Sequence, residues 1–82
     1  MRRAMPDDGV IRVGREKRRA SSVTVIYGLE ALELSEVAST LRKLCGTGGT
    51  TKNGIVELQG DHRDRIVAWF TEQKRRVKRA GG

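Results

Sequence analysis

The run CGTGGTTKNGIVELQGDHRDR, residues 45–65, gathers residue types that are able to bind phosphate. Three of its glycines precede Lys52, and loops that bind nucleotide phosphates use glycines so that bare backbone N–H groups can surround the anion. A Walker A loop has Gly directly before its lysine and Ser or Thr directly after it. Lys52 stands between Thr51 and Asn53, so the spacing argues against a nucleotide-binding loop.

Metal and nucleophile chemistry need clusters of side chains that this sequence does not offer. The single cysteine, Cys45, and the single histidine, His62, do not suffice for a four-ligand zinc site. No nucleophile, base and orienting group recur at a suggestive spacing, and no set of carboxylates is arranged to hold a metal ion. We therefore predict a protein that is not an enzyme and that uses no metal and no cofactor.

The net charge of +7 is concentrated at the two ends of the chain. Residues 1–27 carry +4 and residues 74–82 carry +5, whereas the residues between them sum to −2. Lysines and arginines that neutralise phosphates release condensed counterions, so this segregation favours nucleic acid as the partner. The alternative is a basic protein whose charged ends are merely solvated.

Two strands are predicted near the start of the chain. Polar and apolar side chains alternate in VIRVGRE, residues 10–16, and again in SVTVIYG, residues 22–28, as they do along half-buried strands. The segment between the strands, Arg15–Ser22, is polar, strongly basic and long for a hairpin connection. We expect a mobile basic loop there.

A helix and a second hairpin are predicted next. The apolar residues of Leu34–Cys45 fall on one stripe of an α-helix, and Gly46 follows where a left-handed residue commonly ends a helix. Asn53-Gly54 is the pair preferred at the centre of a type I′ turn. Gly49–Lys52 and Ile55–Gln59 are therefore expected to be its two strands.

A second helix is predicted after Gly60, capped by Asp61, and Val77 offers a last short strand. The order ββαββαβ indicates an α+β fold: a two-layer sandwich with both helices on one face of a mixed sheet of about five strands. Leu41 and Trp69 lie on the apolar stripes of their helices, and we expect both to be buried.

The length of 82 residues suits one domain. Residues 1–9 lack periodicity and are predicted to be a flexible lead-in, which leaves residues 10–82 as the single folded domain. No apolar stretch is long enough to cross a membrane, and a lone cysteine is typical of a reducing compartment. We expect a cytoplasmic protein that is a monomer when free.

Four motifs carry a resemblance to a known family: CGTGGT at 45–50, KNG at 52–54, VELQGD at 56–61 and VKRAGG at 77–82. With the helix and strands that precede them, they resemble eukaryotic translation initiation factor 1 and its archaeal and bacterial YciH-like relatives over residues 10–82. The resemblance implies a protein that binds the small ribosomal subunit near the decoding site. It further implies an influence on start-site selection or on formation of the initiation complex.

The resemblance also assigns candidate sites. In the family, the basic segment between the first two strands approaches the mRNA and the initiator tRNA, and the first helix with the glycine loop lies against ribosomal RNA. The basic tail is a further candidate because of its charge. The candidate residues for binding RNA and the ribosome are Arg15, Lys17, Arg18, Arg19, Arg42, Lys43, Gly48, Gly49, Lys52, Asn53, Lys74, Arg75, Arg76, Lys78 and Arg79.

Gly48 and Gly49 are included because no turn rule requires glycine at either position, and small residues let a backbone approach RNA closely. Two other functions stay open at this point. A general RNA-binding module would use the open sheet face and would need exposed aromatic side chains, for which Tyr27 alone is a poor platform. A protein-interaction module would dock its basic tail on an acidic partner.

Overall fold

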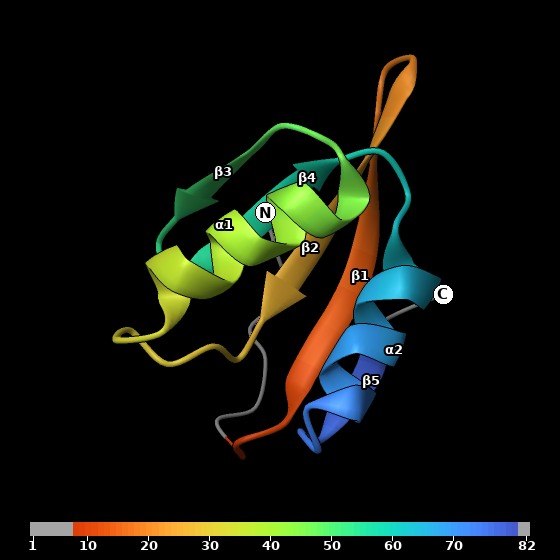
Figure 1. Cartoon of the computed structure of the whole chain (residues 1–82). Helices are drawn as coiled ribbons and strands as arrows, with labels where there is room; N and C mark the ends of the chain where they lie inside the picture. Colours follow the sequence, from red (N-terminus) through yellow and green to blue (C-terminus); the bar gives the residue numbers. More distant parts are fainter. Residues whose placement is uncertain (1–7, 81–82) are drawn as a thin grey trace.

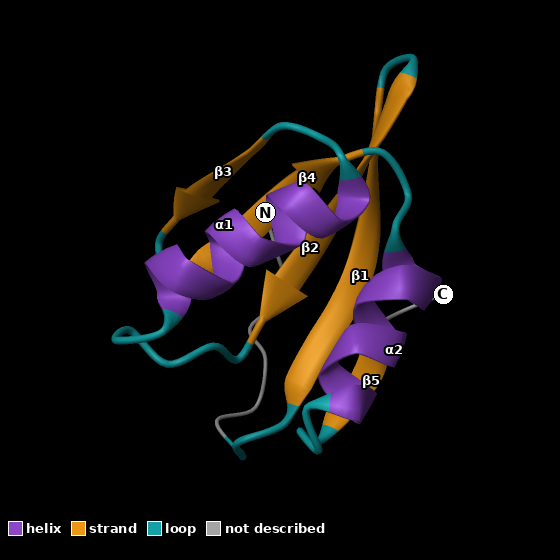
Figure 2. Ribbon diagram, viewed as in Figure 1, coloured by secondary structure: helices purple, strands orange, loops and turns teal. Residues whose placement is uncertain are grey.

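The computed structural model describes residues 8–80 and has two layers, a five-stranded sheet and two helices that cover one of its faces (Figures 1 and 2). This confirms the predicted α+β sandwich and its order of elements. Most of the predicted lead-in, as well as Gly81 and Gly82, lies outside the described residues. The elements are β1 (Ile11–Arg18), β2 (Ser21–Tyr27), α1 (Leu34–Cys45), β3 (Gly49–Lys52), β4 (Ile55–Gln59), α2 (Arg63–Glu72) and β5 (Val77–Ala80).

The sheet has the strand order β3-β4-β2-β1-β5, so β2 is its central strand. Three neighbouring pairs are antiparallel, and β5 runs parallel to β1, which makes the sheet mixed as predicted. The hydrophobic core lies between this sheet and the helices, and it is built from strand residues two apart and from one stripe of each helix. Its fully buried side chains are Ile11, Val13, Ile26, Leu41, Val56, Leu58, Ile66 and Phe70.

Leu41 is buried as predicted, but Trp69 is only half-buried, so that expectation is wrong. Phe70 takes the core position instead, and the two rings meet edge to face with their centroids 5.0 Å apart. Neighbouring residues on a helix point about 100° apart, so only one of two adjacent aromatic side chains can face the sheet squarely. The sequence pattern alone does not say which.

The predicted loop between the first two strands is also wrong. β1 continues through Arg18 and β2 starts at Ser21, so only Arg19 and Ala20 form the turn. Arg19 has the left-handed φ of 43°, which non-glycine residues adopt in tight turns. The outer half of this hairpin carries polar residues on both faces, and no apolar alternation marks it as strand. Figure 1 shows it as a thin ribbon that projects beyond the rest of the sheet.

The other predicted turns are confirmed. Gly46 ends α1 with a left-handed φ of 62°, and the N–H of Thr47 donates to the carbonyl of Arg42 (3.1 Å). Asn53 and Gly54 have φ values of 53° and 77° between β3 and β4, as a type I′ turn requires.

Within residues 8–80, no helix has the length and apolar character needed to cross a bilayer.

We predict that Leu41→Ala lowers the free energy of unfolding by about 2 to 5 kcal/mol, because it leaves a cavity under α1. Leu32→Ala is the matched control, since the Leu32 side chain is fully exposed, and it should change stability by no more than about 0.5 kcal/mol. Urea unfolding followed by circular dichroism measures both. Equal effects of the two substitutions would contradict the packing described here.

Candidate nucleic-acid interface

The sheet register sorts the predicted RNA-binding residues between two ends of the molecule. Glu16 pairs with Val23 and Val23 with Gln59, whose N–H donates to the carbonyl of Gly48 (3.0 Å). The outer hairpin and the loop after α1 therefore lie at one end, which we call the hairpin end. It carries Lys17, Arg18, Arg19, Lys43 and Gly48.

The opposite end, which we call the far end, lies at the other end of β1. The carbonyl of Arg76 accepts a hydrogen bond from the N–H of Ile11 (2.9 Å), at the first residue of that strand. β1 has 8 residues, and at about 3.3 Å per residue it separates the two ends by roughly 26 Å. The two ends therefore cannot contact neighbouring phosphates of one RNA strand. The far end carries Lys52, Asn53, Lys74, Arg75 and Arg76.

Three of the predicted cations at the hairpin end have no carboxylate partner in the described part of the chain: Lys17, Arg19 and Lys43. All three are exposed. Lys17 and Arg19 flank the tip of the first hairpin, and Lys43 lies in the last turn of α1. These side chains are available to an external anion.

Arg18 is different, because its guanidinium is already held by two carboxylates. Its two terminal nitrogens donate to the two carboxylate oxygens of Glu57, each at 3.1 Å, and one of them also donates to Glu16 at 2.9 Å. These bonds raise the pKa of Arg18, with the Glu57 bonds as the larger cause. Arg18 thus lies on β1 and is ion-paired, and it is not part of a loop as predicted.

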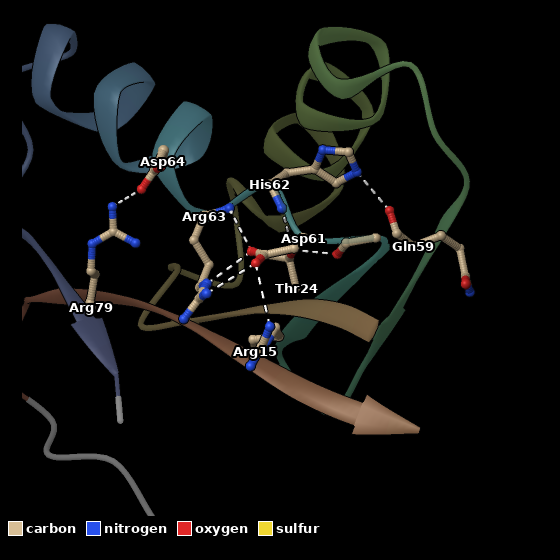
Figure 3. A network of polar contacts seen from close by, with 9 residues as sticks. Arg15, Thr24, Gln59, Asp61, His62, Arg63, Asp64 and Arg79 are labelled. Atoms are coloured by element: carbon tan, nitrogen blue, oxygen red, sulfur yellow. Dashed lines mark hydrogen bonds and ion pairs between the residues drawn. The ribbon is translucent and has the colours of Figure 1, made fainter. Parts of the chain in front are cut away.

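Arg15 and Arg63 both point toward Asp61, at the connection between β4 and α2 (Figure 3). Arg63 donates to both carboxylate oxygens, at 2.8 and 3.0 Å, while Arg15 lies 3.7 Å away. The bonds from Arg63 are the main reason that the pKa of Asp61 is lowered. The predicted cap is wrong in detail: His62 holds the N-cap position, and Asp61 mainly binds the Arg63 side chain.

A buried hydroxyl fixes this connection to the central strand. Thr24 Oγ1 donates to the carbonyl of Gly60 (2.7 Å) and accepts from the N–H of His62 (2.9 Å). The N–H of Gly60 donates to the carbonyl of Ser22 (2.8 Å), and the His62 ring lies 2.7 Å from the carbonyl oxygen of Gln59. The start of α2 is thereby tied to β2 beside the hairpin.

Helix α1 reaches the same end of the sheet. Arg65 from α2 donates to the carbonyl of Leu44 (3.1 Å), which binds the first turn of α2 to the last turn of α1. Arg42 is half-buried and lines a hollow of about 230 Å³ with Ser35, Ala38 and Thr51, whereas Lys43 is exposed. Only Lys43 of this pair extends the exposed hairpin end.

The two glycines of the candidate site have different reasons to be there. A Cβ at Gly49 would collide with the Glu57 carbonyl and lie 2.8 Å from Leu58 Cδ2, so close pairing with β4 requires glycine. No turn rule applies to Gly49, but its pairing with β4 is a structural reason for glycine that the sequence did not show. Nothing lies within 4 Å of a Cβ at Gly48, which is exposed. Gly48 has no such packing reason, and the prediction that glycine lets RNA approach is strongest at this position.

The far end combines free and paired cations. Arg75 donates to both carboxylate oxygens of Glu33, at 2.8 and 2.9 Å, and these bonds are the main cause of the lowered pKa of Glu33. Lys52 and Lys74 are exposed, as is Asn53, and Lys74 has a left-handed φ of 60°. The last two candidates lie on β5, where Arg79 pairs with Asp64 and Lys78 is exposed.

Thr24, Arg63 and Arg65 belong to the hairpin end, but no sequence motif pointed to them. A threonine in a strand gives no sign that its hydroxyl is buried. The sequence around an arginine near a helix start does not show which acceptor its guanidinium binds.

No group of three His, Cys, Asp or Glu in the described region is placed to hold a metal ion. A groove of about 500 Å³ between the helices is lined by Leu44, Asp64, Arg65, Ala68, Trp69 and Glu72.

Comparison with known proteins places the chain. Residues 7–78 match the family described as translation initiation factor SUI1. The chain belongs to the SUI1 family. A protein translation factor SUI1 homolog from Aeropyrum pernix is 48% identical over 69 residues, which cover 80% of this chain and 68% of the relative.

Bacterial relatives of the SUI1 family are similar over more of the chain. Uncharacterized protein YciH from Salmonella typhimurium is 42% identical over 79 residues, covering 92% of this chain and 73% of the relative. Uncharacterized protein sll0546 from Synechocystis is 38% identical over 74 residues, covering 88% and 67%. The resemblance to bacterial YciH-like and archaeal members of the family is thus confirmed.

We predict that Gly49→Ala destabilises the protein by about 1 to 3 kcal/mol, because β3 must move away from β4 to admit the methyl group. Gly48→Ala should change stability by no more than about 0.5 kcal/mol, since open space surrounds that position. Thermal or urea unfolding of both variants decides the matter. If Gly48→Ala were the more damaging of the two, the distinction between the glycines would fail.

Proposed function

We propose that this protein binds the small ribosomal subunit through its hairpin end and modulates start-site selection or the formation of initiation complexes. The observation that carries the proposal is the group of exposed, unpaired cations there, Lys17, Arg19 and Lys43, on a member of a translation initiation factor family. Ribosomal RNA is the surface that such a group fits, because its phosphates lie close together on rigid helices. Binding would release counterions and would weaken as salt rises.

The shape of the hairpin supports a more specific role. It is a narrow two-stranded projection, and such a projection can enter a channel that a flat sheet face cannot (Figure 1). We infer that its tip approaches the mRNA and the initiator tRNA near the decoding site, while Lys43 and Gly48 lie against ribosomal RNA. The far end, with Lys74 and Arg76, would make a weaker second contact.

Both alternative functions have less support. An RNA-binding sheet face uses exposed aromatic side chains, whereas Tyr27 is half-buried, and the nearby Val23 and Val25 are buried. A module that docks an acidic protein through the tail would rely on the far end, where Arg75 is already paired with Glu33. The hairpin end therefore carries the favoured proposal.

We predict that Lys17→Ala/Arg19→Ala weakens binding to purified small subunits more than Lys74→Ala/Arg76→Ala does. Both double variants remove two positive charges from exposed sites, so a nonspecific charge effect would weaken both equally. The slope of log affinity against log salt should fall by about 2 in the hairpin variant if each side chain meets one phosphate. Sedimentation at several salt concentrations measures affinity and slope.

Two outcomes would overturn this assignment: a wild-type affinity that does not depend on salt, or a greater loss in the far-end variant. The role in start-site selection has its own readout in the same proteins. Toe-printing of initiation complexes on AUG and non-AUG messages should show poorer discrimination with the hairpin variant. Unchanged discrimination, with folding intact, would remove the hairpin from that step.

A further inference from the structure

The first hairpin extends past the strands that support it. β2 pairs with β4 only as far as Val23 opposite Gln59, whereas β1 and β2 continue to pair through Lys17 and Arg18. The last bond on that side runs from the N–H of Gly60 to the carbonyl of Ser22, so the hairpin beyond Ser22 is a two-stranded ribbon, visible as the projection in Figure 1. Two strands alone are marginally stable in water, so the direction of this ribbon needs support from elsewhere.

Arg18 supplies a contact that spans three strands. Glu16 on β1 lies opposite Val23 on β2, and Glu57 on β4 lies opposite Val25 on β2. A guanidinium that binds both carboxylates must cross β2 on the sheet face away from the helices, where Val23 and Val25 are buried. The Glu57 side chain is 15% exposed, whereas that of Arg18 is 45% exposed. What holds the guanidinium is therefore the paired geometry of its bonds to both oxygens of Glu57, more than burial.

We propose that Arg18 is a positioning residue that braces the hairpin against β4 and does not itself bind RNA. This rests on the proposed function, because the brace matters by aiming Lys17 and Arg19 at the ribosome. Side chains alternate along β1, so Lys17 lies on the face opposite to Arg18. The face of the ribbon that carries Arg18 is thus anchored to β4, while the face that carries Lys17 and the tip with Arg19 remain exposed for binding.

Removal of Glu57 separates the two possible roles of Arg18 by the sign of the effect. If Arg18 bound phosphate, Glu57→Gln would remove a negative charge and leave Arg18 paired with Glu16 alone, so affinity for the small subunit should rise. If Arg18 is a brace, the hairpin of the Glu57→Gln variant becomes mobile. It must then be ordered on binding, so affinity should fall by about threefold or more. Glu72→Gln is the control for charge, since Glu72 is exposed on α2 away from the hairpin.

The experiment pairs this affinity with amide hydrogen exchange of the free proteins. We expect faster exchange at Lys17–Ser22 in Glu57→Gln but not in Glu72→Gln, and the same in Arg18→Lys, which keeps the charge but loses the two-pronged geometry. Tighter binding of Glu57→Gln to small subunits, or unchanged hydrogen exchange in both Glu57→Gln and Arg18→Lys, would overturn the proposal. If wild type failed to bind small subunits, the proposed function would fall, and exchange alone would decide whether Arg18 is a brace.

Discussion

The rest of the molecule depends on β2, which is hydrogen-bonded to a neighbour on each side. Thr24 faces the helices from this strand, and its buried hydroxyl holds the β4–α2 connection through Gly60 and His62. On the other face, Val23 and Val25 lie where the Arg18 ion pairs cross the strand. One strand thus positions the start of α2 and supports the hairpin, and the two together form the end of the molecule that we assign to RNA.

A basic side chain of this protein indicates a binding surface only after its ion-pair partners within the molecule are known. The chain carries a net charge of +7, yet Arg12, Arg15, Arg18, Arg63, Arg75 and Arg79 each form an ion pair. These arginines bind β-strands, helix ends and turns to one another. The cations that are left for a polyanion are mostly lysines and turn residues. A basic cluster read from the sequence therefore overstates the number of cations that are free to bind an anion.

Elements marked by apolar period or by turn chemistry were predictable, including Leu34–Cys45 and the Asn53-Gly54 turn. The outer half of the first hairpin was not, because a strand exposed on both faces has no alternation. The structural reason for Gly49 was missed because it depends on Glu57, a neighbour distant in sequence, and the same holds for the ion pair of Arg18 with Glu57. The family could be identified from short motifs, whereas the division of the candidate site between two ends needed the register of the sheet.

The most direct test is directed cleavage of ribosomal RNA from an iron chelate attached to one cysteine, after Cys45→Ser removes the native thiol. The chelate is placed at the hairpin end with Arg19→Cys or at the far end with Arg76→Cys. Bound to the small subunit, the first protein should cleave RNA near the decoding site strongly, and the second should cleave there weakly, because β1 separates the two positions. Stronger cleavage from position 76, or none from position 19 in a protein that still binds, would contradict the account.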